Sequence, residues 1–186
     1  MMNLVRHLPN FLTAGRLCAA PLTAWLILKG YDAAALGVFA FAGLSDALDG
    51  YLARRFSYAT RFGAYLDPAA DKLLMLASFV TLTMTHAVPF WLTALVIARD
   101  LAIVIGVGVA WLFSLPLKIE PLYIGKVSTV IQVGYIGLVL LLLALGADQP
   151  GLVMAGTIIA ASVTAASWLV YGQLLVRALA VGRRPA

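Results

Sequence analysis

Long apolar stretches separated by short polar breaks dominate this 186-residue chain, of which 63% is hydrophobic. Each stretch has about 20 residues or more, enough for a helix to cross a hydrocarbon core of about 30 Å. Backbone inside lipid has to satisfy its own polar groups, so the stretches are predicted to be helices. The pattern therefore predicts an all-α membrane protein with six transmembrane helices. These cover residues 10–29, 33–55, 63–86, 89–114, 121–146 and 151–178.

Basic residues are divided unequally between the two sets of polar breaks. The outer breaks carry only Lys29 if the N-terminus is inside. The inner segments then carry Arg6, Arg54, Arg55, Arg61, Lys118, Arg183 and Arg184. By the positive-inside rule, both termini and the break between the second and third spans are predicted to be cytoplasmic. We expect one domain over 1–186, with a short interfacial segment at 1–9 and a cytoplasmic tail at 179–186.

Charge and cysteine content narrow the function classes. The net charge of +5 suits contact with an anionic membrane surface. No basic stripe is interleaved with aromatic residues, so we expect no nucleic-acid partner. Cys18 is the single cysteine, which excludes an intramolecular disulfide.

Four of the eight acidic residues fall in one run across the second and third predicted spans. Asp46 and Asp49 are three residues apart and Asp67 and Asp71 are four apart, so each pair shares one face of a helix. A short basic turn joins the two spans, which predicts antiparallel neighbours whose acidic faces meet at the cytoplasmic boundary. Acidic side chains at membrane depth are costly and mark a functional site by default.

The crowded carboxylates need positive charge beside them, because like charges repel one another. Two divalent cations would balance four carboxylates, and an all-oxygen set favours Mg²⁺ or Mn²⁺ over Zn²⁺. Paired metals clamp phosphate oxygens in phosphoryl displacements. Gly50, Ala53 and Gly63 leave room beside the acids for a ligand, and Arg54 is suited to pair with a phosphate. One such Asp could serve as a helix-to-helix hydrogen bond or a proton relay, but the full pattern favours chemistry on a phosphate-bearing ligand.

The run from Asp46 to Asp71 resembles the signature of the CDP-alcohol phosphatidyltransferases at every position, and the resemblance extends from Pro9-Asn10 to the sixth span. It implies six transmembrane helices, usually a homodimer, with a site open to the cytoplasm and to lipid. It implies that CDP-diacylglycerol and an alcohol give a phosphodiester lipid and CMP. The site would lie on the cytoplasmic or matrix side of an inner or plasma membrane.

The resemblance also implies roles for individual residues. Asp46, Asp49, Asp67 and Asp71 would ligate two metals, and Asp71 would take the proton of the acceptor hydroxyl as general base. The CDP part would contact Gly50, Ala53, Arg54, Gly63, Asn10 and Thr13. Asn10 and Thr13 stand near Arg16 at the start of the first span, where a helix cap and an interfacial anchor are the alternative reading.

Two further polar sites are candidates for binding the acceptor or its phosphate. Arg99 either forms a neutralising pair with Asp100 or faces the cavity and binds a phosphate. Lys126, Thr129 and Gln132 form a loose stripe, in which Lys126 either extends to the interface or contacts the acceptor. An Arg followed by an acidic residue is typical of the family's glycerol-type branch, and the resemblance also favours an acceptor or phosphate contact for Lys126 and Thr129. We therefore predict Arg99, Lys126 and Thr129 as contacts of the acceptor or its phosphate.

The acceptor itself is predicted from two missing cations. Family members that transfer to sn-glycerol 3-phosphate usually have a second Arg where this chain has Val107, and a second Lys where it has Ser128. Their absence favours phosphatidylglycerol, which would give cardiolipin. Glycerol 3-phosphate is the alternative, and other alcohols such as inositol phosphate, serine or choline stay open. A membrane transporter with an intramembrane acidic site is an alternative of another class. Such a protein tends to show inverted repeats and spans broken at the midplane, whereas this sequence shows no repeat and its acidic residues cluster at one end of the spans.

Overall fold

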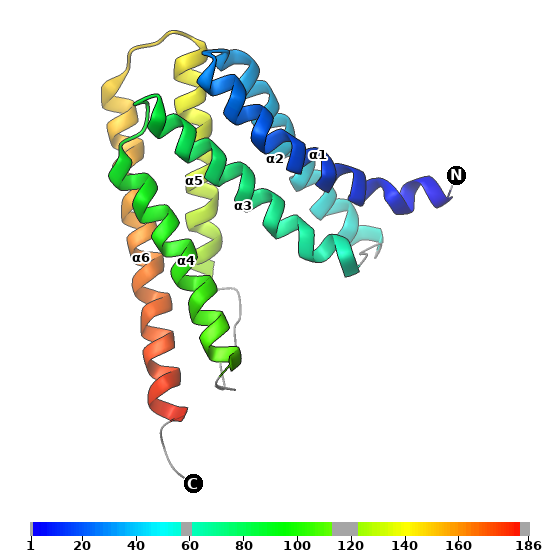
Figure 1. The fold of residues 1–186 in the computed structure, drawn as a ribbon, viewed down its shortest axis with the longest axis vertical. Helices are drawn as coiled ribbons and strands as arrows, with labels where there is room; N and C mark the ends of the chain where they lie inside the picture. The colour runs from blue at the N-terminus through cyan, green and yellow to red at the C-terminus, as the bar shows by residue number, and fades with distance from the viewer. Residues whose placement is uncertain (1, 57–60, 113–122, 183–186) are drawn as a thin grey trace. The chain divides into compact units, whose positions relative to one another are not determined.

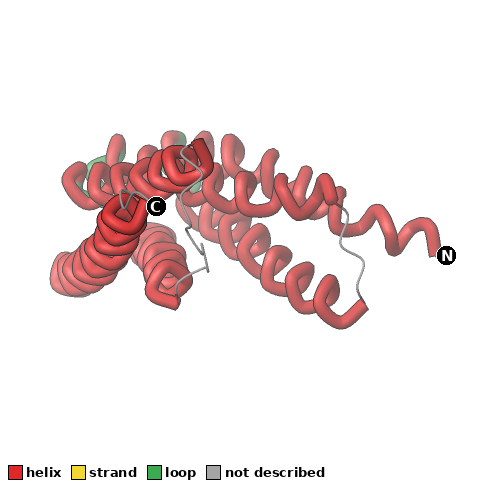
Figure 2. The backbone as a smooth tube through the Cα atoms, turned by 90° about the horizontal axis from the view of Figure 1, so that it is seen from below, coloured by secondary structure: helices red, strands yellow, loops and turns green. Residues whose placement is uncertain are grey.

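The computed structural model describes residues 2–56, 61–112 and 123–182, and within them the side chains of 15–45, 70–106, 108, 112 and 123–174. These parts are helical, with short turns and no strand (Figure 2). The helices are labelled in Figure 1. They are α1 (Met2–Leu28), α2 (Asp32–Phe56), α3 (Arg61–Met84), α4 (Phe90–Leu112), α5 (Tyr123–Ala144) and α6 (Pro150–Gly182). The all-helical prediction is confirmed for the described residues.

The helix bounds differ from the predicted spans mainly at the two ends of the chain. Because α1 begins at Met2, the segment predicted to be a separate interfacial element continues into the first span. α6 extends to Gly182, so the first residues of the predicted tail are helical. An apolar stretch marks the part of a helix that has to be buried in lipid or protein, whereas polar turns can extend a helix beyond it.

Within the described residues, α1, α3 and α5 end in the same type of tight turn. A residue with left-handed backbone follows each of them: Gly30 (φ 74°), His86 (φ 62°) and Gly146 (φ 60°). The next N–H then bonds to the carbonyl five residues earlier at 2.9 Å, in the pairs Tyr31 to Leu26, Ala87 to Leu82 and Ala147 to Leu142. This pattern satisfies carbonyl groups that the end of a helix leaves without partners. The turns coincide with three of the breaks predicted from sequence.

Packing divides the chain into two compact units. One unit comprises Met1–Val88 and Ile136–Gln149, and the other comprises Pro89–Tyr135 and Pro150–Ala186. In the first, α1 packs against both α2 and α3, and in the second α4 packs against α6 (Figure 1). α5 contributes residues to both units. The single domain expected over 1–186 stays a prediction, and each unit is described by itself below.

Small side chains from α1 and α2 form much of the core of the first unit. Ala20 of α1 and Ala35 of α2 are fully buried, as are Ala70, Phe79 and Leu82 of α3. Small residues allow membrane helices to approach closely. This packing holds α1 against the two helices that carry the acidic run.

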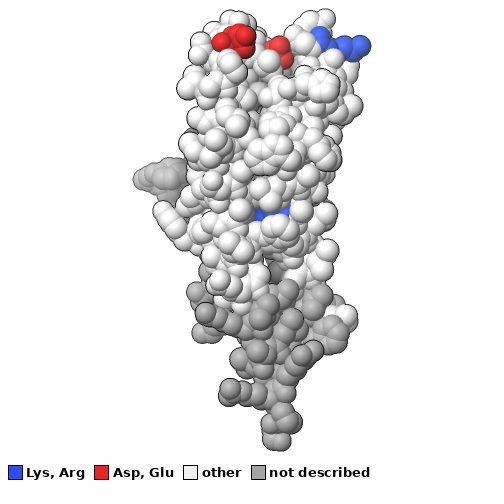
Figure 3. All heavy atoms as spheres, turned by 90° about the vertical axis from the view of Figure 1, so that its left-hand side faces the viewer, with Lys and Arg blue, Asp and Glu red and all other residues white. Residues whose placement is uncertain are grey.

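Among the residues whose side chains the structure describes, two helical segments are long and apolar enough to cross a membrane, Tyr123–Ala144 and Pro150–Leu174. Gly15–Leu28 and Asp32–Ser45 are shorter apolar segments. Most of the described surface on the face shown in Figure 3 carries no charged side chain. On α6, for example, the exposed large apolar side chains include Leu152, Met154, Ile158, Ile159, Trp168 and Leu169. Apolar side chains exposed in such numbers indicate a surface that lipid or another protein covers.

Candidate functional site

The acidic run lies on two consecutive helices, as the sequence predicted. Asp46 and Asp49 are in α2, and Asp67 and Asp71 are in α3. The residues that accompany them are Gly50, Ala53 and Arg54 in α2 and Gly63 in α3. Asp71 alone in this group has a described side chain. A meeting of the four carboxylates around metal ions therefore stays a prediction.

An arginine from the first helix binds Asp71. Nη1 of Arg16 donates a hydrogen bond to Oδ1 of Asp71 at 2.6 Å. The Arg16 side chain is 2% exposed, whereas that of Asp71 is 43% exposed. A buried guanidinium thus supplies positive charge from α1 to a partly accessible carboxylate of α3. Charge-assisted contacts of this length are among the stronger hydrogen bonds in proteins.

The sequence groups Arg16 with Asn10 and Thr13 and gives it no partner. A buried guanidinium requires an acidic partner, and this requirement could have directed Arg16 to the acidic run, though not to one carboxylate in it. Asn10 and Thr13 are both in α1. Their side chains lie outside the described ones, so their contact with the CDP part stays a prediction.

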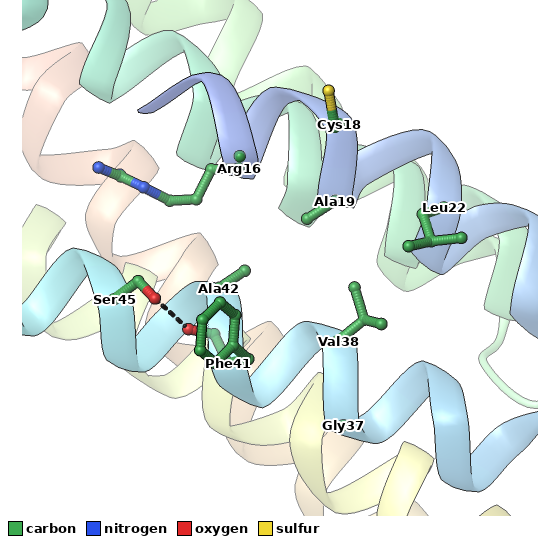
Figure 4. A pocket seen from close by; sticks show the side chains of 10 residues that line it. Arg16, Cys18, Ala19, Leu22, Gly37, Val38, Phe41, Ala42 and Ser45 are labelled. Carbon is green, nitrogen blue, oxygen red and sulfur yellow. Dashed lines mark hydrogen bonds between the residues drawn. The ribbon is translucent and has the colours of Figure 1, made fainter. Parts of the chain in front are cut away.

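An apolar cavity of about 510 Å³ lies between α1 and α2 (Figure 4). Leu22 and Val38 lie toward one end of it, and Arg16 and Ser45 lie at the other. Ser45 donates to the carbonyl of Phe41 at 2.7 Å. Because Ser45 is the last residue before the acidic run, the polar end of the cavity adjoins that run along α2.

Arg99 of α4 is buried, with 4% exposure, and other side chains hold its guanidinium. Nη1 donates to Oδ1 of Asp100 at 2.8 Å, and Nε and Nη2 both donate to Oγ of Ser167 in α6, at 3.2 and 2.7 Å. Cζ lies 5.6 Å from the ring centroid of Tyr171, within the range of a cation–π contact. Arg99 and Asp100 therefore pair, as one of the two readings of the sequence proposed. Binding of the acceptor by Arg99 stays a prediction.

The first turn of α5 approaches Arg99 closely at Gly125. A Cβ added at Gly125 would lie 2.7 Å from the Tyr171 hydroxyl and 3.2 Å from Nη2 of Arg99. The next residue, Lys126, is exposed, and Thr129 is half-buried with its hydroxyl donating to the Gly125 carbonyl at 3.2 Å. The acceptor contacts predicted for Lys126 and Thr129 stay predictions.

A buried polar stripe on α6 is a feature that the sequence analysis missed. Thr157, Thr164 and Ser167 are at most 1% exposed and lie at helical spacing. The hydroxyls of Thr157 and Tyr135 are 2.7 Å apart, and Nε2 of Gln132 donates to Oγ1 of Thr164 at 2.8 Å. Small hydroxyl residues repeated along one face of an apolar helix indicate a helix-to-helix contact, and that spacing was the available signal.

Comparison with known protein families gives one match across most of the chain. A family model described as CDP-alcohol phosphatidyltransferase matches residues 6–171. The matched region contains the acidic run, Arg16 and the cluster around Arg99.

Curated relatives carry names of two related activities. The chain is 37% identical over 151 residues to a Drosophila melanogaster protein named "Probable cardiolipin synthase (CMP-forming)", covering 72% of this chain and 47% of the relative. It is 39% identical over 131 residues to a cardiolipin synthase (CMP-forming) of Streptomyces coelicolor, covering 67% and 60%. A chloroplastic CDP-diacylglycerol–glycerol-3-phosphate 3-phosphatidyltransferase 1 of rice is 33% identical over 184 residues, covering 89% and 56%. The chain thus spans about half the length of these relatives.

Proposed function

This chain belongs to the CDP-alcohol phosphatidyltransferase family, and we propose that it moves the phosphatidyl group of CDP-diacylglycerol onto a hydroxyl of a glycerol-type acceptor with release of CMP. The observation that carries the proposal is the acidic run on α2 and α3, together with the contact of Arg16 with Asp71. The names of the relatives support the same reaction class.

We propose that the four carboxylates of the acidic run hold two divalent cations, Mg²⁺ or Mn²⁺. The residues fit this role, because they offer only carboxylate oxygens, which these ions prefer. The described member, Asp71, is partly accessible and already binds a positive group. When bound, the ions would polarise the phosphate oxygens and stabilise the negative charge on departing CMP.

Asp71 is the proposed general base. Its carboxylate takes the proton of the acceptor hydroxyl, the hydroxyl oxygen bonds to the phosphorus of the phosphatidyl group, and the bond from that phosphorus to the CMP oxygen breaks. Arg16 contributes by holding Oδ1, which limits rotation of the carboxylate and keeps it in reach of the hydroxyl. A positioned base is more effective than a mobile one because the reacting atoms are already aligned.

The CDP part is proposed to lie against the small residues that accompany the acids, with Arg54 pairing to a phosphate. The full set is Asn10, Thr13, Gly50, Ala53, Arg54 and Gly63. Helix faces that lack bulky side chains let a flat nucleotide approach the backbone. All six residues are on α1, α2 or α3, which belong to the first unit.

The cavity between α1 and α2 supports a lipid substrate. Its volume of about 510 Å³ and its apolar lining suit part of an acyl chain, and its polar end adjoins the acidic run. An acyl chain in this cavity would place its headgroup near the carboxylates. This arrangement is typical of sites that take an apolar ligand with few polar contacts at one end.

Phosphatidylglycerol is the proposed acceptor, giving cardiolipin. Arg99 is paired with Asp100, so the pair has no net charge to offer a doubly charged phosphomonoester such as glycerol 3-phosphate. Ser128, which stands where a second Lys would be expected, is fully buried and accepts a hydrogen bond from Gln132 at 3.3 Å. A phosphodiester with one negative charge needs less compensation, which favours phosphatidylglycerol.

Glycerol 3-phosphate is the second candidate acceptor. The rice relative named for that acceptor aligns over 89% of this chain. Exposed Lys126 could supply a cation that the Arg99–Asp100 pair does not.

We further propose six membrane spans with both termini and the acidic run on the cytoplasmic or matrix side. The unequal distribution of Lys and Arg supports this orientation, and α5 and α6 support the spans by length and composition. The homodimer implied by the family resemblance is proposed with it.

The test is turnover by purified protein in lipid vesicles containing CDP-diacylglycerol, with phosphatidylglycerol and glycerol 3-phosphate offered in separate reactions. We expect CMP release, a four-chain lipid product by mass with phosphatidylglycerol, and loss of both when a chelator removes divalent ions. Mg²⁺ or Mn²⁺ should restore turnover. If phosphatidylglycerophosphate is the only product, the acceptor is glycerol 3-phosphate and the proposed acceptor is wrong. If neither acceptor gives CMP, the proposed reaction is wrong; this is the result expected of a transporter.

A further inference from the structure

Two residues of α6, Ser167 and Tyr171, contact the guanidinium of Arg99. Ser167 accepts hydrogen bonds from both Nε and Nη2, which fixes one edge of the planar guanidinium. Cζ of Arg99 lies over the ring of Tyr171, 5.6 Å from the ring centroid, so the ring limits the space open to the guanidinium. An arginine side chain has several freely rotating bonds, so these two contacts remove most of its orientational freedom.

The hydrogen bonds leave a defined part of the guanidinium for another partner. Five N–H groups are available on an arginine. Asp100 takes one from Nη1, and Ser167 takes one each from Nε and Nη2. Among the described residues, one N–H on Nη1 and one on Nη2 remain. Two N–H groups on the terminal nitrogens suit phosphate or diol oxygens, which accept paired hydrogen bonds.

Gly125 of α5 completes this arrangement by having no side chain. A Cβ there would lie 2.7 Å from the Tyr171 hydroxyl, closer than such atoms approach, and 3.2 Å from Nη2 of Arg99. The backbone of α5 therefore comes against the ring and the guanidinium at the same point. The residues of this arrangement all belong to the second unit: Arg99, Gly125, Ser167 and Tyr171.

The other two hydroxyls of the polar stripe on α6 show which partners suffice for packing between helices. Thr157 and Thr164 meet the neutral partners Tyr135 and Gln132. Only at Ser167 is the partner a charged group, which is costly within an apolar segment and marks function by default. A hydrogen bond that only joined two helices would need neither a charged partner nor an aromatic ring beside it.

We propose that Ser167 and Tyr171 are positioning residues that orient Arg99 toward the acceptor. Gly125 is required because it leaves room for the Tyr171 ring and the Arg99 guanidinium. This proposal rests on the acceptor role of Arg99 in the proposed function. It adds α6 to the elements that determine acceptor binding, whereas the CDP part is assigned to residues of the first unit.

The first test compares kinetic parameters for the two substrates. Ser167→Ala should raise the KM for the acceptor about tenfold, because a hydrogen bond to a charged group is lost, and should leave the KM for CDP-diacylglycerol within about twofold. Ser167→Thr keeps the hydroxyl and should restore much of the acceptor KM. Thr164→Val is the matched control, since it removes a buried hydroxyl from the same face of α6 without contact to Arg99.

The second test uses the close approach at Gly125. Gly125→Ala should raise the acceptor KM because the new methyl group displaces the Tyr171 ring. Tyr171→Phe removes the hydroxyl at 2.7 Å and leaves ring carbon Cε2 at 3.4 Å, an ordinary contact. The double variant should therefore bind acceptor better than Gly125→Ala alone. Equal defects in the single and double variants would contradict this account of the glycine.

A binding measurement separates this proposal from the proposed reaction. Phosphatidylglycerol or glycerol 3-phosphate added to the protein in neutral detergent should raise the Tm, because a ligand of the native state stabilises it. Loss of the Tm rise in Ser167→Ala but not in Thr164→Val supports the positioning role, whether or not the wild-type protein turns over. Absence of turnover in a wild type that shows the Tm rise overturns the proposed reaction alone. An active wild type whose Ser167→Ala variant keeps its acceptor KM and Tm rise overturns the positioning role. A wild type with neither turnover nor a Tm rise overturns both.

Discussion

Asp71 shows how one residue connects the acidic run to the rest of the first unit. The sequence gives its place in the run, and the structure adds the 2.6 Å contact with Arg16 of α1. A carboxylate that is 43% exposed remains reachable by a substrate, while a buried guanidinium limits its orientation. This combination is what a general base requires, since its reach and its direction both matter.

Replacement of Asp71 tests the proposed base directly. Asp71→Asn should lower turnover at least about 100-fold, because an amide cannot accept the proton. It should lower the Tm moderately, because the amide oxygen can still accept from Arg16 but the buried guanidinium loses the negative charge of Asp71. Asp148→Asn is the matched control, because Asp148 is exposed between α5 and α6 and should be neutral. Near-normal turnover in Asp71→Asn would show that another group takes the proton.

Arg16 should matter for stability as well as for turnover. Arg16→Met removes a buried cation beside a carboxylate and should lower the free energy of unfolding by about 1–2 kcal/mol, less than for a fully buried pair because Asp71 is partly hydrated. Chemical unfolding in detergent measures this. Arg16→Lys keeps the charge and should lose less. Added Mg²⁺ should recover part of the lost stability if cations bind the same carboxylates, and an unchanged loss would contradict that overlap.

At the scale of helices, the turns carry information that an apolar pattern does not. Gly30 and Gly146 are predictable helix ends, because glycine adopts positive φ without steric cost. His86 takes the same conformation at φ 62°, where a side chain is strained. The i to i−5 hydrogen bond of the turn holds it there. Sequence located this break by the nearby Pro89, without indicating the strain.

His86→Gly should therefore stabilise the protein. The exposed imidazole contributes little packing, and relief of strain should raise the free energy of unfolding by about 0.5–1 kcal/mol after the extra entropy of glycine is counted. Gly146→Ala in the equivalent turn is the opposing control and should lower it by about 1 kcal/mol. Thermal unfolding in detergent measures both, and a lower Tm for His86→Gly would show that the imidazole has a role beyond the turn.

The two groups of candidate residues, one in each unit, were unequally accessible to sequence reasoning. The acidic run is local in sequence, so helical spacing alone places its members on consecutive helices. Arg16 and Asp71 are 55 positions apart, and Arg99 and Ser167 are 68 apart, so no periodicity relates them. Only the need of a buried guanidinium for a partner points to such contacts, and it does not choose between candidates. Helix number follows from hydropathy in the same local way, whereas the contacts between helices do not.

At the scale of the whole molecule, the proposed reaction depends on which side of the membrane the acidic run faces. The segments predicted to be inner carry seven cations and the predicted outer ones carry one, and this difference predicts that the acidic run faces the cytoplasm or matrix. If the orientation is right, the α2–α3 connection and the α5–α6 turn lie on opposite sides.

Cysteine labelling tests that orientation because the chain has one native cysteine, exposed on α1. In a Cys18→Ala background, Asp148→Cys in the α5–α6 turn should react with a membrane-impermeant maleimide added to intact cells. Ser57→Cys, between α2 and α3, should react only after the membrane is opened. A protein that turns over normally but labels in the reverse sense would place the acidic run outside, and the distribution of Lys and Arg would then not govern its insertion. Labelling of both positions in intact cells would mean that both lie outside. The segment between them would then cross the membrane an even number of times, where three crossings are proposed, and α3, α4 or α5 would not be a simple span.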